Sequence, residues 1–433
     1  MPSPGAYDGG VNEPSILGSV EAFVGLLVAL AFVALVTRRI RLPYTVALVL
    51  FGVAISIVSP PVHLQVSSQL VLLVLLPGLV FEAAYSLDQR ELLRALAGVL
   101  LLAVPGVLVV AAFVAIVLHL AAGIALGPAF VVGAMVSATD PAAVTSSIRR
   151  LHAPVRLATV VEAESLLNDG TGIVAFTIAV AAAQGTMSPA QGALEFVGVS
   201  AGSLLVGAAS GLVISRVAAA FDDHLVELTL TLLAAYGTYL VADQLGLSGI
   251  IATVVAGVVL GTYGRRVGLS RRVQEAIDVV WEFLAFLLTA LVFLLIGVAI
   301  PVSGLAEALV PIAWGVVAIL VGRAGVVYVM LGGASWLAER AVGRERIPVG
   351  WLHVMFWAGL RGAVAVALAL SLPADFPDRA MLQEITFGIV LFTLLVQATS
   401  ADRVVRWAGA RGALPVAAEL PAYDELPDEA PSV

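Results

Sequence analysis

Six ionisable residues are predicted to lie deep inside the long apolar stretches of the sequence. At the depth of a lipid bilayer, such a group costs about 2.5–3.5 kcal/mol on insertion scales, so it needs a partner or a use. One interpretation is that these residues form ion pairs that hold helices together. For Arg323 this structural role and a functional role are equally well supported. The acids favour a functional interpretation because they outnumber the bases. The six residues are Glu82, Asp140, Glu164, Asp169, Arg323 and Arg361.

A helix break is predicted at Ser137-Ala138-Thr139-Asp140-Pro141. Proline disfavours helix at the residue before it and lacks the backbone donor that a helix interior needs. The chain should therefore restart as a helix at Pro141, with Asp140 as its cap. Backbone groups freed in mid-membrane must line a cavity or find partners. A freed carbonyl, such as that of Thr139, can bind a cation.

The next apolar span carries a cluster of oxygen-bearing side chains between Glu162 and Gly170. Ser165 and Asp169 are four residues apart and share one helix face, and Glu164 and Asn168 share a neighbouring face. A hydroxyl, a carboxylate and a free carbonyl are hard ligands, which suit a small hard cation better than a soft transition metal. Glu162 lies nearer the start of this span, on the side that the arginines mark as cytoplasmic.

A second helix break is predicted at Gly359-Leu360-Arg361-Gly362. Glycines flank a buried arginine there, and the segment corresponds in position to the first break. We expect the two breaks to cross. Arg361 needs an anion, and Glu164 is the expected partner.

The composition requires a membrane protein. Of the 433 residues, 61% are hydrophobic and 12% are charged, whereas soluble domains carry about 25% charged residues. This excludes a soluble enzyme and a disordered chain. The sequence has no cysteine and no lysine, which excludes thiolate metal sites and Schiff-base chemistry.

Thirteen apolar spans are predicted to form an all-α, polytopic fold. They are residues 16–36, 43–58, 67–85, 92–118, 126–147, 155–182, 190–217, 225–242, 247–263, 276–299, 305–336, 348–371 and 381–408.

Arginine placement supports this count and predicts the orientation. At alternate span ends, and in the connections or tail that follow them, lie 19 of the 22 arginines, and positive charge marks cytoplasmic loops. Residues 1–15 are then an extracellular segment and 16–408 the transmembrane domain. Residues 409–433 form an acidic, disordered cytoplasmic tail.

An odd number of spans allows an inverted repeat. With the seventh span as a linker, spans 1–6 and 8–13 run in opposite directions, an arrangement common in secondary transporters. Glycines four residues apart, such as Gly207/Gly211 and Gly257/Gly261, permit close helix contacts, either inside the protein or between two copies.

Together, the three polar motifs resemble those of the monovalent cation:proton antiporter-1 family, the NhaP-like and NHE-like sodium/proton exchangers. The matching segments are 139–144, 162–169 and 359–364. Hydropathy agrees over about residues 16–408. Ala163 stands where the family has glycine, which affects only local helix packing.

The resemblance implies an antiporter fold with a six-helix transport bundle, two crossed discontinuous helices and a separate dimerisation bundle. It assigns cation and proton binding to Asp169, with Asp140, Ser165, the Thr139 carbonyl and, through water, Glu82 assisting. Na⁺ would bind at Asp169, Asp140, Ser165 and Thr139. A supporting polar network is implied for Glu164, Asn168 and Arg361, and neutralisation of the half-helix carbonyl ends for Arg323.

The expected activity is exchange of sodium, or another monovalent cation, for protons by alternating access. A buried carboxylate must hold a proton or a cation, so competition between them is itself an exchange mechanism. The expected setting is a homodimer in the plasma membrane. Neither a cofactor nor a nucleic-acid partner is expected, because Na⁺ or Li⁺ and H⁺ are the cargo. The same oxygens bind Na⁺, Li⁺ and K⁺, so residue types alone do not select among them.

Asn168 predicts electroneutral exchange. The related electrogenic exchangers carry a second aspartate at this position, whereas an amide cannot titrate.

The alternative function is cation-coupled symport of an organic solute on a similar fold, which needs a larger, partly apolar substrate pocket. A membrane hydrolase is disfavoured, because the five histidines show no metal-ligand spacing such as His-Glu-x-x-His.

Overall fold

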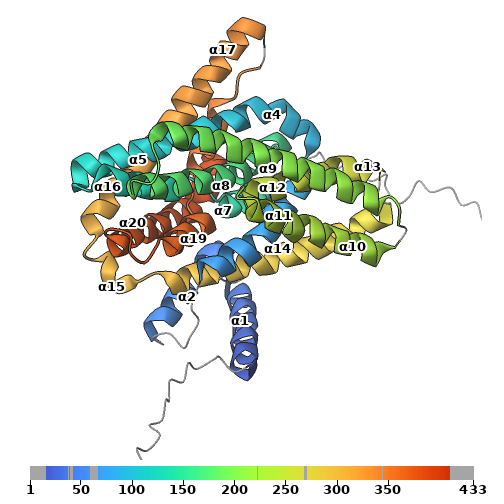
Figure 1. Cartoon of the computed structure of the whole chain (residues 1–433), viewed down its shortest axis with the longest axis horizontal. Helices are drawn as coiled ribbons and strands as arrows, with labels where there is room; N and C mark the ends of the chain where they lie inside the picture. The colour runs from blue at the N-terminus through green and yellow to red at the C-terminus, as the bar shows by residue number, and fades with distance from the viewer. Residues whose placement is uncertain are drawn as a thin grey trace, which may run out of the picture.

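The computed structural model describes residues 16–37, 39, 42–58, 67–221, 223–267, 271–343 and 345–409. In these ranges the chain consists of helices and their connections, without strands. Most helices pack side by side in one bundle, and α1 and α17 project from it (Figure 1). The predicted extracellular segment 1–15 and the tail beyond residue 409 lie outside the described residues.

Helical structure occupies each of the thirteen predicted ranges. Up to residue 218 the segments are α1 (Ile16–Thr37), α2 (Tyr44–Val58), η1 and α3 (Leu70–Leu75, Leu76–Tyr85), α4, η2 and α5 (Gln89–Leu101, Leu102–Gly106, Val107–Ala122), α6 and α7 (Leu126–Met135, Ala142–Arg150), α8 (Val155–Ala183) and α9 (Pro189–Ala218). The segments labelled η are short π-helical stretches.

The remaining segments follow the same pattern. They are α10, η3 and α11 (His224–Leu232, Leu233–Gly237, Thr238–Gln244), α12, η4 and α13 (Gly249–Val259, Leu260–Gly264, Arg265–Val267), α14 (Arg271–Ala299), α15 (Val302–Leu305), α16, η5 and α17 (Leu309–Ala324, Gly325–Leu331, Gly332–Val342), α18 and α19 (Val349–Trp357, Ala363–Ser371), and α20, η6 and α21 (Arg379–Phe392, Thr393–Ala398, Thr399–Trp407).

Within the described ranges, eight helices are long and apolar enough to cross a membrane. They are Gln89–Ala122, Val155–Ala183, Pro189–Ala218, His224–Gln244, Gly249–Val267, Val273–Ala299, Leu309–Val342 and Arg379–Trp407. Shorter apolar helices occupy Val24–Thr37, Tyr44–Val58, Leu70–Tyr85 and Leu126–Met135. The protein is therefore a polytopic, all-helical membrane protein. The count of thirteen crossings stays a prediction.

Both predicted helix breaks are present, and they meet. The helix before the first break ends at Met135 and α7 begins at Ala142, while α18 ends at Trp357 and α19 begins at Ala363. The backbone N–H of Asp140 donates to the Leu360 carbonyl over 2.9 Å. This hydrogen bond joins the two interruptions, so the expected crossing of two discontinuous helices is confirmed.

Contacts between distant connections agree with the predicted sidedness. Arg150 at the end of α7 pairs with Asp402 of α21 over 2.6 Å. Arg266 of α13 donates to Gln89 at the start of α4 over 2.6 Å. In each contact the two partners lie at helix ends that the arginine pattern predicts on the same side of the membrane, and the orientation itself stays a prediction.

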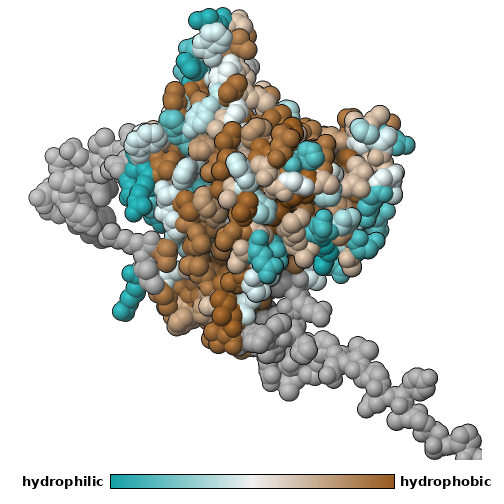
Figure 2. Space-filling model, turned by 90° about the vertical axis from the view of Figure 1, so that its left-hand side faces the viewer, coloured by the Kyte–Doolittle hydropathy of each residue, from teal (hydrophilic) through white to brown (hydrophobic). Residues whose placement is uncertain are grey.

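The surface is suited to lipid. Figure 2 shows a face whose centre is mainly hydrophobic, with hydrophilic residues gathered toward its edges. The least buried of the eight long helices is α9. It exposes large apolar side chains along its length, among them Leu194, Val197, Leu205 and Val213.

The glycine pairs serve packing inside the chain. A Cβ on Gly207 of α9 would collide with the Ala252 carbonyl oxygen of α12, and one on Gly261 would collide with the Tyr85 carbonyl oxygen. These glycines thus let helix backbones approach closely, as α9 and α12 do. Such contacts hold α9 and α3 closely against α12.

Candidate functional site

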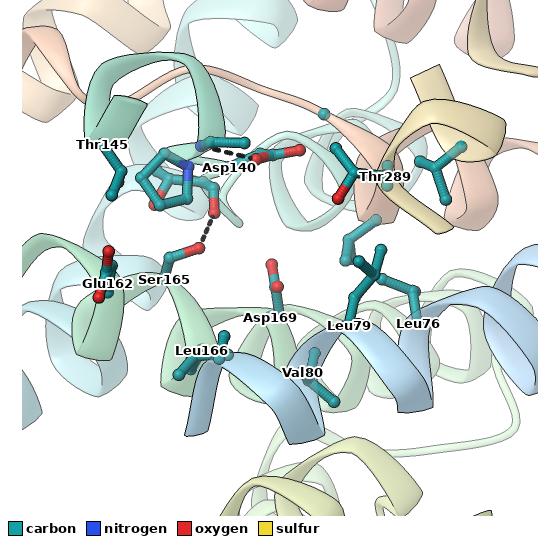
Figure 3. Close-up of a pocket in the computed structure, with 18 of the residues that line it drawn as sticks. Leu76, Leu79, Val80, Asp140, Thr145, Glu162, Ser165, Leu166, Asp169 and Thr289 are labelled. Carbon is teal, nitrogen blue, oxygen red and sulfur yellow. Dashed lines mark hydrogen bonds between the residues drawn. The ribbon is translucent and has the colours of Figure 1, made fainter. Parts of the chain in front are cut away.

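Asp169 of α8 projects into a cavity of about 350 Å³ (Figure 3). Its carboxylate lies on the same wall as Ser165, one helical turn away, as the sequence pattern predicted. Within the described part of the chain, no group donates a hydrogen bond to this carboxylate and no arginine or histidine pairs with it. The Asp169 carboxylate is therefore available to a proton or an ion that enters the cavity.

Asp140 faces the same cavity from the first break. One of its carboxylate oxygens accepts from the backbone N–H of Ala142, the first residue of α7, over 3.1 Å. The N-cap position is taken by Pro141, so the helix restarts one residue later than predicted. The carboxylate also packs against Gly362 of the second break, where a Cβ would overlap it. The glycine of the second motif thus makes room for the aspartate of the first.

Thr139 is held by two side chains of α8. The Ser165 hydroxyl donates to the Thr139 carbonyl over 2.5 Å. Asn168 accepts from the Thr139 backbone N–H over 3.1 Å and donates to its hydroxyl over 2.6 Å. These bonds satisfy backbone groups that the break removes from the helix ladder, and they fix Thr139 beside Asp169.

Glu82 lines the cavity from α3 and accepts a hydrogen bond from Ser86 over 3.3 Å. Farther along, Glu162 pairs with Arg149 over 2.8 Å, and both residues line the cavity. The cavity therefore extends from Asp169 to the arginine-rich ends of α7 and α8.

The prediction that Glu164 pairs with Arg361 is wrong. Glu164 instead forms a two-pronged ion pair with Arg323 of α16, in which Nη2 donates to Oε2 over 3.0 Å and Nη1 donates to Oε1. Arg323 Nη2 also donates to the Met355 carbonyl near the end of α18, over 2.9 Å. Arg323 thus reaches a half-helix carbonyl, as expected, and carries the ion pair as well.

Arg361 instead stabilises the carbonyl end of the first broken helix. Its Nη1 donates to the carbonyls of Ser137 and Ala138 over 3.0 and 2.9 Å. Its side chain is fully buried. The positive charge lies where α6 presents unpaired carbonyls, so it offsets the negative end of that helix dipole. The second break thereby supplies the counter-charge for the first.

Sequence reasoning missed Thr393 at the start of η6. Its hydroxyl accepts from the backbone N–H of Arg361 over 3.0 Å and so anchors the second break. Thr393 has 0% relative exposure. The sequence signal was a single hydroxyl in the apolar run from Phe387 to Val396.

The arrangement presents oxygen atoms of the kind that a small hard cation prefers. Its oxygens come from two carboxylates, a hydroxyl and a carbonyl, and the arginines nearby bond to other groups. Among the described residues there is no group of three or more His, Asp or Glu side chains suited to holding a metal ion.

A family model described as "Sodium/hydrogen exchanger, transmembrane" matches residues 26–407, which include both breaks and the whole cavity lining. The chain belongs to the sodium/hydrogen exchanger family. The resemblance seen in the three motifs is therefore confirmed.

Relatives within this family align over most of the chain. The Na⁺/H⁺ antiporter ApNhaP of Aphanothece halophytica is 36% identical over 91% of this chain and 76% of its own length. The Na⁺/H⁺ antiporter NhaH of Halobacillus dabanensis is 32% identical over 90% of this chain and 98% of its own.

The exchanger fold is also matched by a solved structure. The sodium proton antiporter MjNhaP1 of Methanocaldococcus jannaschii superposes with a TM-score of 0.70 and 19% sequence identity. The superposition covers 90% of this chain and 98% of that one. This likeness confirms the expected antiporter fold.

Replacing either member of the Glu164–Arg323 pair with alanine should lower the melting temperature strongly. Breaking a buried ion pair costs about 3–5 kcal/mol because the remaining charge has no partner. The double variant should lose less than the sum of the single losses. Melting of the purified protein in detergent measures this.

The matched control is Arg149→Ala. Its pair with Glu162 leaves the arginine side chain 68% exposed, so the loss should stay below about 1 kcal/mol. Additive losses for Glu164 and Arg323, or coupling of Glu164 to Arg361 instead, would contradict the pairing seen here.

Proposed function

We propose that this protein exchanges sodium, or another monovalent cation, for protons across the membrane. The observation that carries the proposal is the unpaired Asp169 carboxylate in a cavity of a membrane-embedded chain. An isolated charge there is costly, so the carboxylate holds a proton or a cation. Because one group serves both, binding one ion releases the other.

The cation binds to Asp169 and Asp140, with Ser165 and Thr139 completing the site. The Ser165 hydroxyl hydrogen points to the Thr139 carbonyl, which leaves lone pairs of Ser165 Oγ for the ion. Glu82 assists through water from the opposite wall. Asn168 and the two arginines hold these groups in place without binding the ion.

Transport proceeds by alternating access. The cavity lining reaches the arginine-rich end through Glu82, Glu162 and Arg149. On the side of α3 and α14 the lining is mainly apolar, with Leu76, Val292 and Phe293 among its members. A rocking or elevator-like movement of the bundle that carries the breaks would expose the occupied site to the other side.

The exchange is electroneutral, with one proton for one monovalent cation. Asn168 cannot titrate, and both halves of its amide bond to Thr139. Glu164 is engaged in the ion pair with Arg323, so we assign it no exchanged proton. Asp169 is then the exchangeable carboxylate of its helix.

We place the protein in the plasma membrane with its N-terminus outside and its C-terminus in the cytoplasm. The arginine distribution supports this orientation. The two halves then form the inverted repeat, and two copies form a homodimer. Symport of an organic solute finds no support among the named relatives.

Asp169→Asn should abolish exchange while the protein stays folded. The substitution keeps the side-chain volume and removes the exchangeable charge. Proteoliposomes with a pH gradient and labelled sodium, without any organic solute, measure the flux. The control Asp88→Asn keeps the N-cap of α4 and should transport like the wild type. Clear residual sodium flux in Asp169→Asn would refute the assignment.

The stoichiometry predicts that an imposed membrane voltage has no effect. One proton exchanged for one cation moves no net charge. A potential set with valinomycin across the proteoliposome membrane should leave the rate and the end-point of sodium flux unchanged. A shift with voltage would mean that a further carboxylate, Glu82 or Asp140, carries a second proton.

A further inference from the structure

The cavity around Asp169 has two walls of different chemistry. One wall, formed by α8 and the two breaks, carries the carboxylates and the hydroxyl proposed to bind the cation. The other wall is formed by α3 and α14 and is mainly apolar. Its members are Leu76, Leu79, Val80, Ala83, Ala285, Val292 and Phe293, with Glu82, Ser86 and Thr289 as polar exceptions.

Thr289 is the polar exception on α14. From Phe283 to Ala299 this helix carries no other polar side chain. Figure 3 shows the Thr289 side chain directed into the cavity from the wall opposite Asp169. A polar group in so apolar a segment needs a partner.

The helix does not supply that partner. Threonines elsewhere in the membrane helices donate to the carbonyl four residues earlier, as Thr171, Thr177 and Thr262 do. Thr289 makes no such bond, and no described residue pairs with its hydroxyl. The hydroxyl is therefore free to act on whatever occupies the cavity.

We propose that Thr289 is a specificity-determining residue, whose hydroxyl supplies an oxygen to the hydration shell of the cation held by Asp169. A hard monovalent cation prefers oxygen neighbours, and this is an oxygen that α14 offers. The shell is then closed from both walls, and its size depends on the spacing between α8 and α14. The inference rests on the proposed cation exchange.

The test compares two substitutions at this position in the full chain, reconstituted in proteoliposomes. Thr289→Val keeps the shape and removes the hydroxyl, while Thr289→Ser keeps the hydroxyl. The matched control is Thr177→Val, which alters an exposed threonine of α8 whose hydroxyl bonds to Ile173. KM and kcat are measured for Na⁺, Li⁺ and K⁺ at one pH.

For Thr289→Val we expect the sodium KM to rise roughly two- to tenfold, the effect of losing one hydrogen-bond-like contact, with little change in kcat. The rise should differ among the three cations. Thr289→Ser and Thr177→Val should match the wild type. In detergent, the sodium concentration that gives half the thermal stabilisation should shift for Thr289→Val by the same factor.

An unchanged sodium KM in Thr289→Val, in a chain whose wild type is active, would overturn this inference and leave the proposed function intact. A raised KM that Thr289→Ser fails to restore would also overturn it, because packing would then be the cause. A wild type that moves no sodium against protons would overturn the proposed function itself.

Discussion

The structure depends on one constraint: among the described residues, no arginine or histidine neutralises the Asp169 carboxylate inside this membrane protein. Each deep arginine bonds elsewhere, Arg323 to Glu164 and Arg361 to the carbonyls of Ser137 and Ala138. Of the four carboxylates that line the cavity, Glu82, Asp140 and Glu162 each accept a hydrogen bond, whereas no described residue donates one to Asp169. Because an unpaired charge is costly in a low-dielectric interior, the site is stable only when a proton or a cation occupies it. The proposed exchange is the direct consequence.

The two helix breaks make such a site possible. Breaking a helix in mid-membrane frees backbone groups that must be satisfied, and here each break satisfies the other. Asp140 N–H bonds to the Leu360 carbonyl, and Arg361 neutralises the end of α6. Gly362 gives the Asp140 carboxylate its space. The crossing therefore holds Asp140 and Thr139 in place and leaves the Asp169 carboxylate without a partner among the described residues.

Local chemistry was predictable from the sequence, and long-range pairing was not. Proline after Asp140 and glycines around Arg361 predict both breaks, and helical periodicity places Ser165 on the face of Asp169. The partner of Glu164 depends instead on the rotation and height of α8, α16 and α18, which no local pattern records. For the same reason, only the three-dimensional structure shows that Arg323 pairs with Glu164 and that Arg361 bonds to the carbonyls of the first break. The same holds for the hydrogen bond by which Thr393 holds the second break.

The most direct test of the shared carboxylate is the pH dependence of sodium transport by the wild-type protein. If a proton and sodium compete for one site, acidification should raise the sodium KM and leave the maximal rate unchanged at saturating sodium. The rise should approach about tenfold per pH unit once the proton dominates. A maximal rate that falls with acidification while KM stays constant would contradict the account, because the proton and the cation would then occupy separate sites.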